Sequence, residues 1–240
     1  MSTSTNPVID AVFDFWFESE LPSEALLGII LSKLEDYAQV NRLPLLQVPE
    51  NIRITDPNLK AQPLYEIFSP GKPYKITLGD NLLGLAINGS YIGWNKSYLP
   101  EIEKVFSAIF ETKRISKINR MGMRYVDFFD FNIFNDCKVK INIAEEAKSS
   151  EKMFLKLESL MFGHVETVLV ISNDTSVIQD NVLKQGSIID IVTSITDATI
   201  LESVFKDITD FFNQVDLMHT VNKDEFKKVI SDELCKQLNL

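Results

Sequence analysis

The chain has 240 residues, a formal net charge of -10 at pH 7 and a hydrophobic content of 45%. These values favour a globular protein with a sizeable core, and they exclude a disordered chain or a small disulfide-stabilised scaffold. A negative chain also repels the phosphate backbone, so nucleic-acid binding is not expected.

The location of the protein is predicted from what its sequence lacks. No apolar run approaches the roughly 20 residues that span a bilayer. The segment from Met1 to Asn6 is polar and uncharged rather than basic and then apolar, as a secretory leader is. We therefore expect a cytoplasmic protein without a membrane anchor.

The first part of the chain predicts a strand, a helix and an antiparallel meander. Every second residue is apolar at Ile9, Ala11, Phe13, Phe15 and Phe17, which indicates a strand with one buried face. Pro22 then opens a helix, and residues 42–60 read mostly as loop because three prolines interrupt them. Strands at about 62–69, 73–79 and 81–88 follow, separated by glycine-containing turns.

The rest of the chain alternates in the same way between helix and strand patterns. A helix is expected near 98–112, followed by the strand "INRMGMRYVDFFDF" at residues 118–131. Four strands are expected after it, at 138–143, 153–160, 165–172 and 186–195. A long helix then carries Leu201 through Val215, and a last helix starts near Asn222, whose spacing to Glu225 suits a capping box. These C-terminal helices could also form a homodimer surface.

Short stretches of the two halves are similar to each other. Asp80-Asn81-Leu82-Leu83 matches Asp180-Asn181-Val182-Leu183, Gly89-Ser90 matches Gly186-Ser187, and "IEKVFSAI" from Ile102 matches "LESVFKDI" from Leu201. This order is consistent with a diverged duplication, although apolar helices that follow glycine-serine turns also look alike by chance. The sequence therefore predicts an α+β fold of two related halves, 1–136 and 137–240, in one compact unit. Each half would be an antiparallel meander packed on a long helix.

A basic cluster in the middle strand is the main candidate site. Arg120 and Arg124 share one face of this strand, about 13 Å apart, with Gly122 between them. Arg114 and Lys117 lie just before them. Guanidinium groups bind carboxylates and phosphates bidentately, so this face could hold a small anion or an acidic segment of a partner protein. The alternative is that the arginines form structural ion pairs with acidic side chains of the same protein.

An enzymatic alternative rests on acidic residues around the same strand. Asp127, Asp130, Glu146 and Lys148 resemble the carboxylates and lysine of a metal-dependent nuclease or phosphodiesterase, in which the carboxylates hold a divalent ion. The triplet that contains Glu146 and Lys148 is very common in proteins. Two cysteines and two histidines without ligand spacing do not fit a zinc site, and we expect no cofactor.

Several stretches together resemble a known family. They are "NPVIDAVFDFWF", a "GW" before a helix, "RMGMRYVDFFDF", "GSIIDI" and "FKKVISDELCKQL". They are similar to a sporadically distributed family of prokaryotic proteins of uncharacterised function, with a middle strand like R-x-G-x-R-Y and a C-terminal segment like I-[ST]-D-E-L. The resemblance implies a shared architecture and transfers no catalytic residue. The patchy distribution of the family suggests mobile defence or toxin–antitoxin loci.

Together these observations favour a binding protein over an enzyme. We expect a non-enzymatic partner, such as an antitoxin-like component of a defence locus, that binds a protein or a small anion through the strand bearing Arg120 and Arg124. The metal-dependent nuclease remains the enzymatic alternative. A purely structural subunit, whose arginines serve only the core, is the third possibility.

Overall fold

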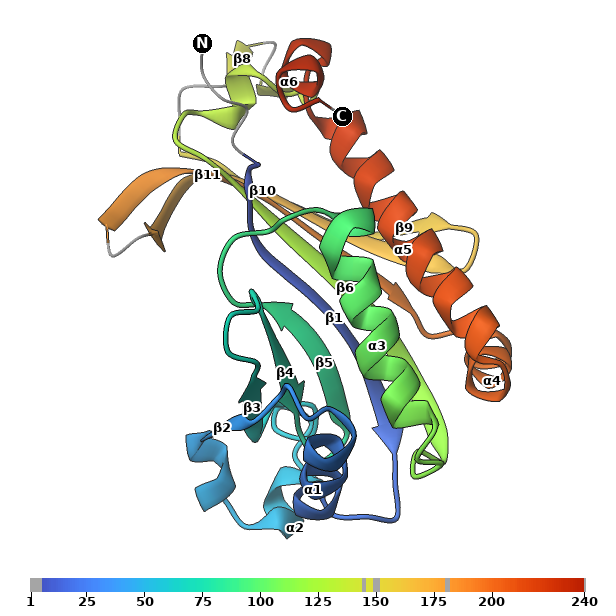
Figure 1. Cartoon of the computed structure of the whole chain (residues 1–240). Helices are drawn as coiled ribbons and strands as arrows, with labels where there is room; N and C mark the ends of the chain where they lie inside the picture. The colour runs from blue at the N-terminus through green and yellow to red at the C-terminus, as the bar shows by residue number, and fades with distance from the viewer. Residues whose placement is uncertain (1–5, 144–145, 149–151, 180–181, 240) are drawn as a thin grey trace. The chain divides into compact units, whose positions relative to one another are not determined.

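The computed structural model describes residues 6–143, 146–148, 152–179 and 182–239. It confirms the α+β fold class: an antiparallel sheet of many strands combines with six α-helices among the described residues (Figure 1). The chain forms two compact units. Unit 1 contains the described residues up to Asp10 together with Arg124–Thr193 and Leu217–Leu240, and unit 2 contains Ala11–Met123 and Ser194–Asp216.

Unit 2 is built on an antiparallel sheet. Its strands follow the order β2 (Gln39–Arg42), β3 (Tyr65–Phe68), β4 (Tyr74–Leu78), β5 (Leu82–Ile87), β1 (Val8–Glu18) and β6 (Lys117–Phe129), the last two of which continue into unit 1. The predicted meander is confirmed, because β3 pairs with β4 and β4 pairs with β5. Strand β2, by contrast, was not predicted. Part of the expected loop is also helical, as η1 (Pro44–Gln47) and α2 (Glu50–Arg53).

Helices cover one face of the unit 2 sheet and bury its phenylalanines. The helices are α1 (Ser23–Lys33), α3 (Leu99–Phe110), which follows the π-helical turn η2 (Trp94–Tyr98), α4 (Ala198–Lys206) and the start of α5 (Ile208–Val229). The Phe13 ring contacts Phe106 of α3 and Phe211 of α5, with ring centroids 4.9 and 5.9 Å apart. The residues that alternate with the buried side chains of β1, β3 and β4 are half-exposed, as in a sheet packed on one face.

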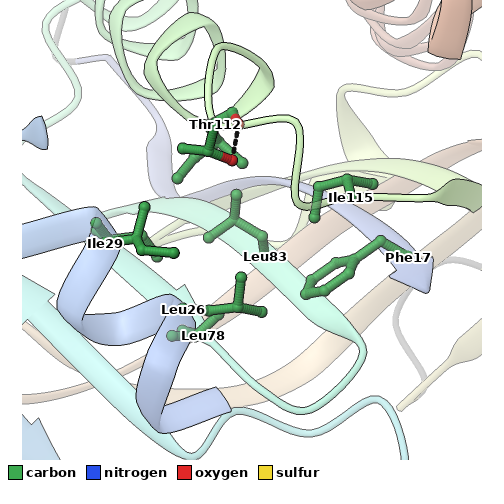
Figure 2. A pocket seen from close by; sticks show the side chains of 9 residues that line it. Phe17, Leu26, Ile29, Leu78, Leu83, Thr112 and Ile115 are labelled. Carbon is green, nitrogen blue, oxygen red and sulfur yellow. Dashed lines mark hydrogen bonds between the residues drawn. The ribbon is translucent and has the colours of Figure 1, made fainter. Parts of the chain in front are cut away.

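A small void lies in this core, and it is lined by apolar side chains of α1, β4, β5 and the end of α3 (Figure 2). Its volume is about 10 Å³, enough for a single water at most. The hydroxyl of Thr112 in its wall donates its hydrogen bond to the Ile109 carbonyl oxygen at 2.6 Å, so it is not available as a donor to a ligand. The void is therefore too small to be a ligand site.

Unit 1 continues the sheet pattern with long strands. Its strand order is β6, β11 (Val182–Ile195), β10 (Val165–Gln179) and β9 (Phe154–Phe162), and β7 (Ile141–Ile143) and β8 (Glu146–Lys148) form a separate hairpin. The remaining elements are η3 (Ile133–Asn135), the second part of α5, and α6 (Asp232–Gln237). Side chains of α5 and α6, including Phe226, Val229 and Leu234, pack in a core with Ile171 and Ile189. Packing thus accounts for these apolar residues, and dimerisation stays a prediction.

Two helix boundaries differ from the prediction. The expected long helix is broken at Asp207, which separates α4 from α5. No helix begins at Asn222, because α5 runs through it and its side-chain amide donates instead to the Ile191 carbonyl oxygen at 2.9 Å. The last helix starts ten residues later, at Asp232, where the Ser231 side chain caps the Leu234 amide.

The two compact units contain different residue ranges from the expected halves. Residues 136 and 137, the expected boundary, both belong to unit 1. The matched dipeptides also differ in setting, since Gly89-Ser90 follows β5 whereas Gly186-Ser187 lies inside β11. Asp180 and Asn181 lie outside the described residues. A duplication stays a prediction.

Candidate functional site

Arg120 lies on the half-exposed face of the unit 2 sheet, opposite the helices. One of its terminal nitrogens, Nη1, donates to Asp14 Oδ1 at 3.1 Å, and its guanidinium carbon lies 5.0 Å from the centroid of the Trp16 ring. Asp14 and Trp16 share this face because they alternate with Phe13 and Phe15, which point to the helices. The three side chains form a compact charged and aromatic cluster.

Two glycines make room for this cluster. A Cβ at Gly122 would lie 2.4 Å from Nη1 of Arg120, so the guanidinium lies directly over the bare backbone of its own strand. A Cβ at Gly84, which pairs with Asp14, would lie 3.2 Å from the Asp14 Cβ and 2.7 Å from the Thr77 hydroxyl. Side chains at these positions would displace the pair. We call Asp14, Trp16, Arg120, Gly84 and Gly122 the Arg120 site.

The charges of the Arg120 site are closely balanced. Burial raises the pKa of Asp14 to about 6, although the neighbouring Arg120 acts in the opposite direction. Side-chain exposure is 21% for Arg120 and 24% for Asp14. Of the nitrogens of Arg120, only Nη1 makes a hydrogen bond to a residue that the structure describes. The remaining donors can therefore meet a partner without breaking the internal pair.

Arg124 belongs to unit 1 and is paired more completely. Its Nε and Nη2 donate to the two carboxylate oxygens of Asp190, at 2.9 and 2.8 Å. The hydrogen bonds that Arg124 donates to Asp190 raise the pKa of Arg124, and 47% of the arginine side chain remains exposed. This fork-to-fork geometry already occupies one of the edges through which the guanidinium can bind an anion bidentately. A role of Arg124 in binding stays a prediction.

The two remaining basic candidates lie at one end of unit 2. Lys117 lines a groove of about 590 Å³ between the start of β6 and helix α4, and Arg114 precedes the first lining residue by two positions. The groove is lined by residues 116–119 and by Thr196, Ala198, Leu201, Glu202, Phe205 and Lys206. We call it the α4 groove.

The residues of the enzymatic alternative have different environments. Asp127 is buried on the helix-facing side of β6, and burial, together with the charge of Asp190, raises its pKa to about 8. Asp130 is exposed just after the strand. Glu146 and Lys148 are the ends of β8, but their side chains lie outside the described part. A carboxyl that holds its proton at neutral pH is a poor ligand for a divalent ion.

Two features are absent from the described part of the chain. No group of three or more histidine, cysteine, aspartate or glutamate residues there could hold a metal ion. None of its helices combines the length and the apolar character needed to cross a membrane.

Comparisons with known proteins bear only on whether this chain has recognisable relatives. No protein-family model matches it, and no curated protein sequence is significantly similar to it. The resemblance described above therefore stays a prediction.

Sequence reasoning missed the partners of the basic residues. The alternation in β1 shows that Asp14 and Trp16 share a face, but it does not indicate which strand lies beside them. The α4 groove was also missed, because Ile118 and Phe205 come from distant parts of the chain. The signal that pointed to this end of unit 2 was the run of basic residues from Lys113 to Lys117.

Proposed function

We propose that this chain is a non-enzymatic binding protein that recognises a partner protein through the Arg120 site. The carrying observation is that the Arg120 guanidinium stacks on Trp16 and is held by Asp14 on a half-exposed sheet face. Arginine and tryptophan are the residue types that most often dominate protein interfaces. Because Arg120 is already held in place, little conformational entropy is lost when a partner binds.

The charge balance of the site favours a protein over a small anion as the ligand. A free carboxylate or phosphate gains little attraction from a guanidinium whose charge Asp14 already balances, at a site whose net charge is close to zero. A protein surface can instead accept hydrogen bonds from the remaining Arg120 donors and pack an apolar side chain against Trp16. The proposed partner thus presents a backbone carbonyl or carboxylate beside an apolar group.

The test compares the affinity of variants at the Arg120 site with that of a control variant at Arg124. The family resemblance suggests that partners are encoded by neighbouring genes. The products of these genes would be tested for co-purification with the wild-type chain, and the affinity of each partner would be measured by calorimetry. Arg120→Met should weaken binding by roughly 10- to 100-fold, the range of an interface hot spot. Gly122→Ala should weaken it as well, since it displaces the guanidinium without changing the charge.

Arg124→Met is the matched control, because Arg124 lies on the same strand and is bound to Asp190. It should change the affinity less than threefold. A folded Arg120→Met variant that keeps full affinity for the partner would refute the proposal. Circular dichroism and thermal unfolding would establish that each variant is folded.

A structural subunit is the second candidate, and the pairing of both arginines with carboxylates favours it. In that case Arg120→Met and Arg124→Met would each lower the stability of the chain and leave all partner affinities unchanged. The same two measurements therefore separate the candidates.

A further inference from the structure

The α4 groove has an apolar floor. Ala198, Leu201 and Phe205 recur at helical spacing along one side of α4, and Ile118 faces the same groove from the start of β6. Ile118 and Leu201 are buried and Phe205 is half-buried, so the floor is part of the packed structure. Its volume of about 590 Å³ lies within the range of small-molecule sites.

Basic side chains border this apolar floor. Lys117 and Lys206 line the groove, and each makes one ion pair, with Glu18 and with Glu202 respectively. All four of these side chains are more than half exposed, and ion pairs on such a surface are weak and easily exchanged. An incoming anion can therefore share both lysines.

The turn before β6 adds further positive charge. Lys113 and Arg114 are exposed, and neither has an ion-pair partner among the residues that the structure describes. Arg114 lies two positions before Ser116 of the groove, so their Cα atoms are at most about 7 Å apart. The end of the groove is thus positive in a chain whose overall charge is -10.

The N-terminus of α4 does not supply the anion site. The Asp197 side chain already accepts hydrogen bonds from the amides of Thr199 and Ile200, at 2.9 and 3.1 Å. An anionic head would therefore be held by lysine side chains, while the body of the ligand lies on Leu201 and Phe205.

We propose that the α4 groove binds a small amphipathic anion, with its hydrocarbon part on the floor and its carboxylate at Lys117 and Lys206. The class comprises medium-chain alkyl carboxylates and aryl carboxylates. This site is separate from the Arg120 site, so its failure would leave the proposed function untouched.

The experiment uses decanoate as the probe and decyltrimethylammonium as its cationic counterpart. Binding of each would be measured by calorimetry on the full chain, below the micelle-forming concentration. Decanoate should bind at least roughly tenfold more tightly than the cation, because the floor is shared and only the head group differs. Equal affinity for the two probes, or no binding of decanoate up to millimolar concentration, would overturn the proposal.

Variants locate the binding. The double variant Lys117→Gln with Lys206→Gln should bind decanoate roughly tenfold more weakly than the wild type. Phe205→Ser should bind both probes more weakly. Lys60→Gln with Lys223→Gln removes the same charge from exposed positions outside the groove and should change neither affinity. Groove variants that are folded by circular dichroism and bind decanoate with wild-type affinity would show that decanoate does not bind in the α4 groove.

Discussion

The two arginine–aspartate pairs of unit 2 join the same residue types in different ways. Arg53 donates from all three of its nitrogens, to both oxygens of Asp80 and to the Val48 carbonyl, and the two side chains are only 7% and 10% exposed. Arg120 donates from one nitrogen to Asp14 and is about three times as exposed. The first arginine is fully used by its own fold, whereas the second keeps donors for another molecule.

A third aspartate extends the comparison. Asp127 of unit 1 is as buried as Arg53, but no ion pair to it occurs among the described residues. Its pKa rises to about 8, against about 6 for Asp14 beside Arg120. Burial raises the pKa of both carboxyls, and a neighbouring guanidinium limits the rise for Asp14. Removing these groups one at a time should therefore give three different results.

Arg53→Met should cause the largest loss of stability. It leaves the Asp80 carboxylate buried without its counter-charge, which typically costs about 3–5 kcal/mol. The free energy of unfolding in urea should fall by this amount, whereas Arg42→Met at an exposed position should change it by less than about 0.5 kcal/mol. A loss below about 1 kcal/mol for Arg53→Met would show that Asp80 finds another partner.

Asp127→Asn should change the pH dependence of stability. The folded pKa of about 8 lies above the ordinary value of 3.8, so between these values the folded state keeps a proton that the unfolded chain has lost. Wild-type stability should therefore fall as the pH rises through this window, by up to about 1.4 kcal/mol per pH unit. The variant lacks this slope, and urea unfolding from pH 4 to pH 8 measures the difference.

Asp130→Asn is the control for this effect, because Asp130 is exposed just after the same strand. It should leave the wild-type pH dependence unchanged. If Asp127→Asn also left the slope in place, another group would be responsible for it.

Asp14→Asn should show the same sign over a narrower range. The folded pKa of about 6 confines the fall in stability to the range between about pH 4 and pH 6, with no further change from this group above it. The total effect should be smaller than at Asp127, since Arg120 stabilises the ionised form. A variant whose stability differs from that of the wild type by a constant amount from pH 4 to pH 8 would contradict the raised pKa.

Local patterns predicted much of the fold. The alternation from Ile9 to Phe17 gave β1, and the turn at Gly79 to Asn81 gave the β4–β5 hairpin, because both signals lie within a few neighbouring residues. Asn222 misled the prediction, since its spacing to Glu225 fits a helix start equally well inside a helix. Only a contact with Ile191 explains why a polar residue is buried there.

The candidate site was less predictable. The sequence indicated that Arg120 and Gly122 share a face, which the position of the Arg120 guanidinium over Gly122 supports. It could not indicate that Asp14 and Trp16 would meet them, because strand neighbours are set by the topology of the sheet. Whether an arginine is fully paired within the protein or keeps donors for a partner therefore depends on contacts between residues far apart in the chain.

The interleaving of the two units constrains how this chain can fold during synthesis. Phe211, which packs on Phe13 and Phe106, is made long after both of them, and unit 1 likewise draws on residues near both chain ends. Neither core can close while the ribosome still holds the last third of the polypeptide. Phenylalanines of the nascent chain therefore stay exposed until synthesis is nearly complete. Correct folding should depend more on rapid release or on a chaperone here than in a protein whose domains emerge one after the other.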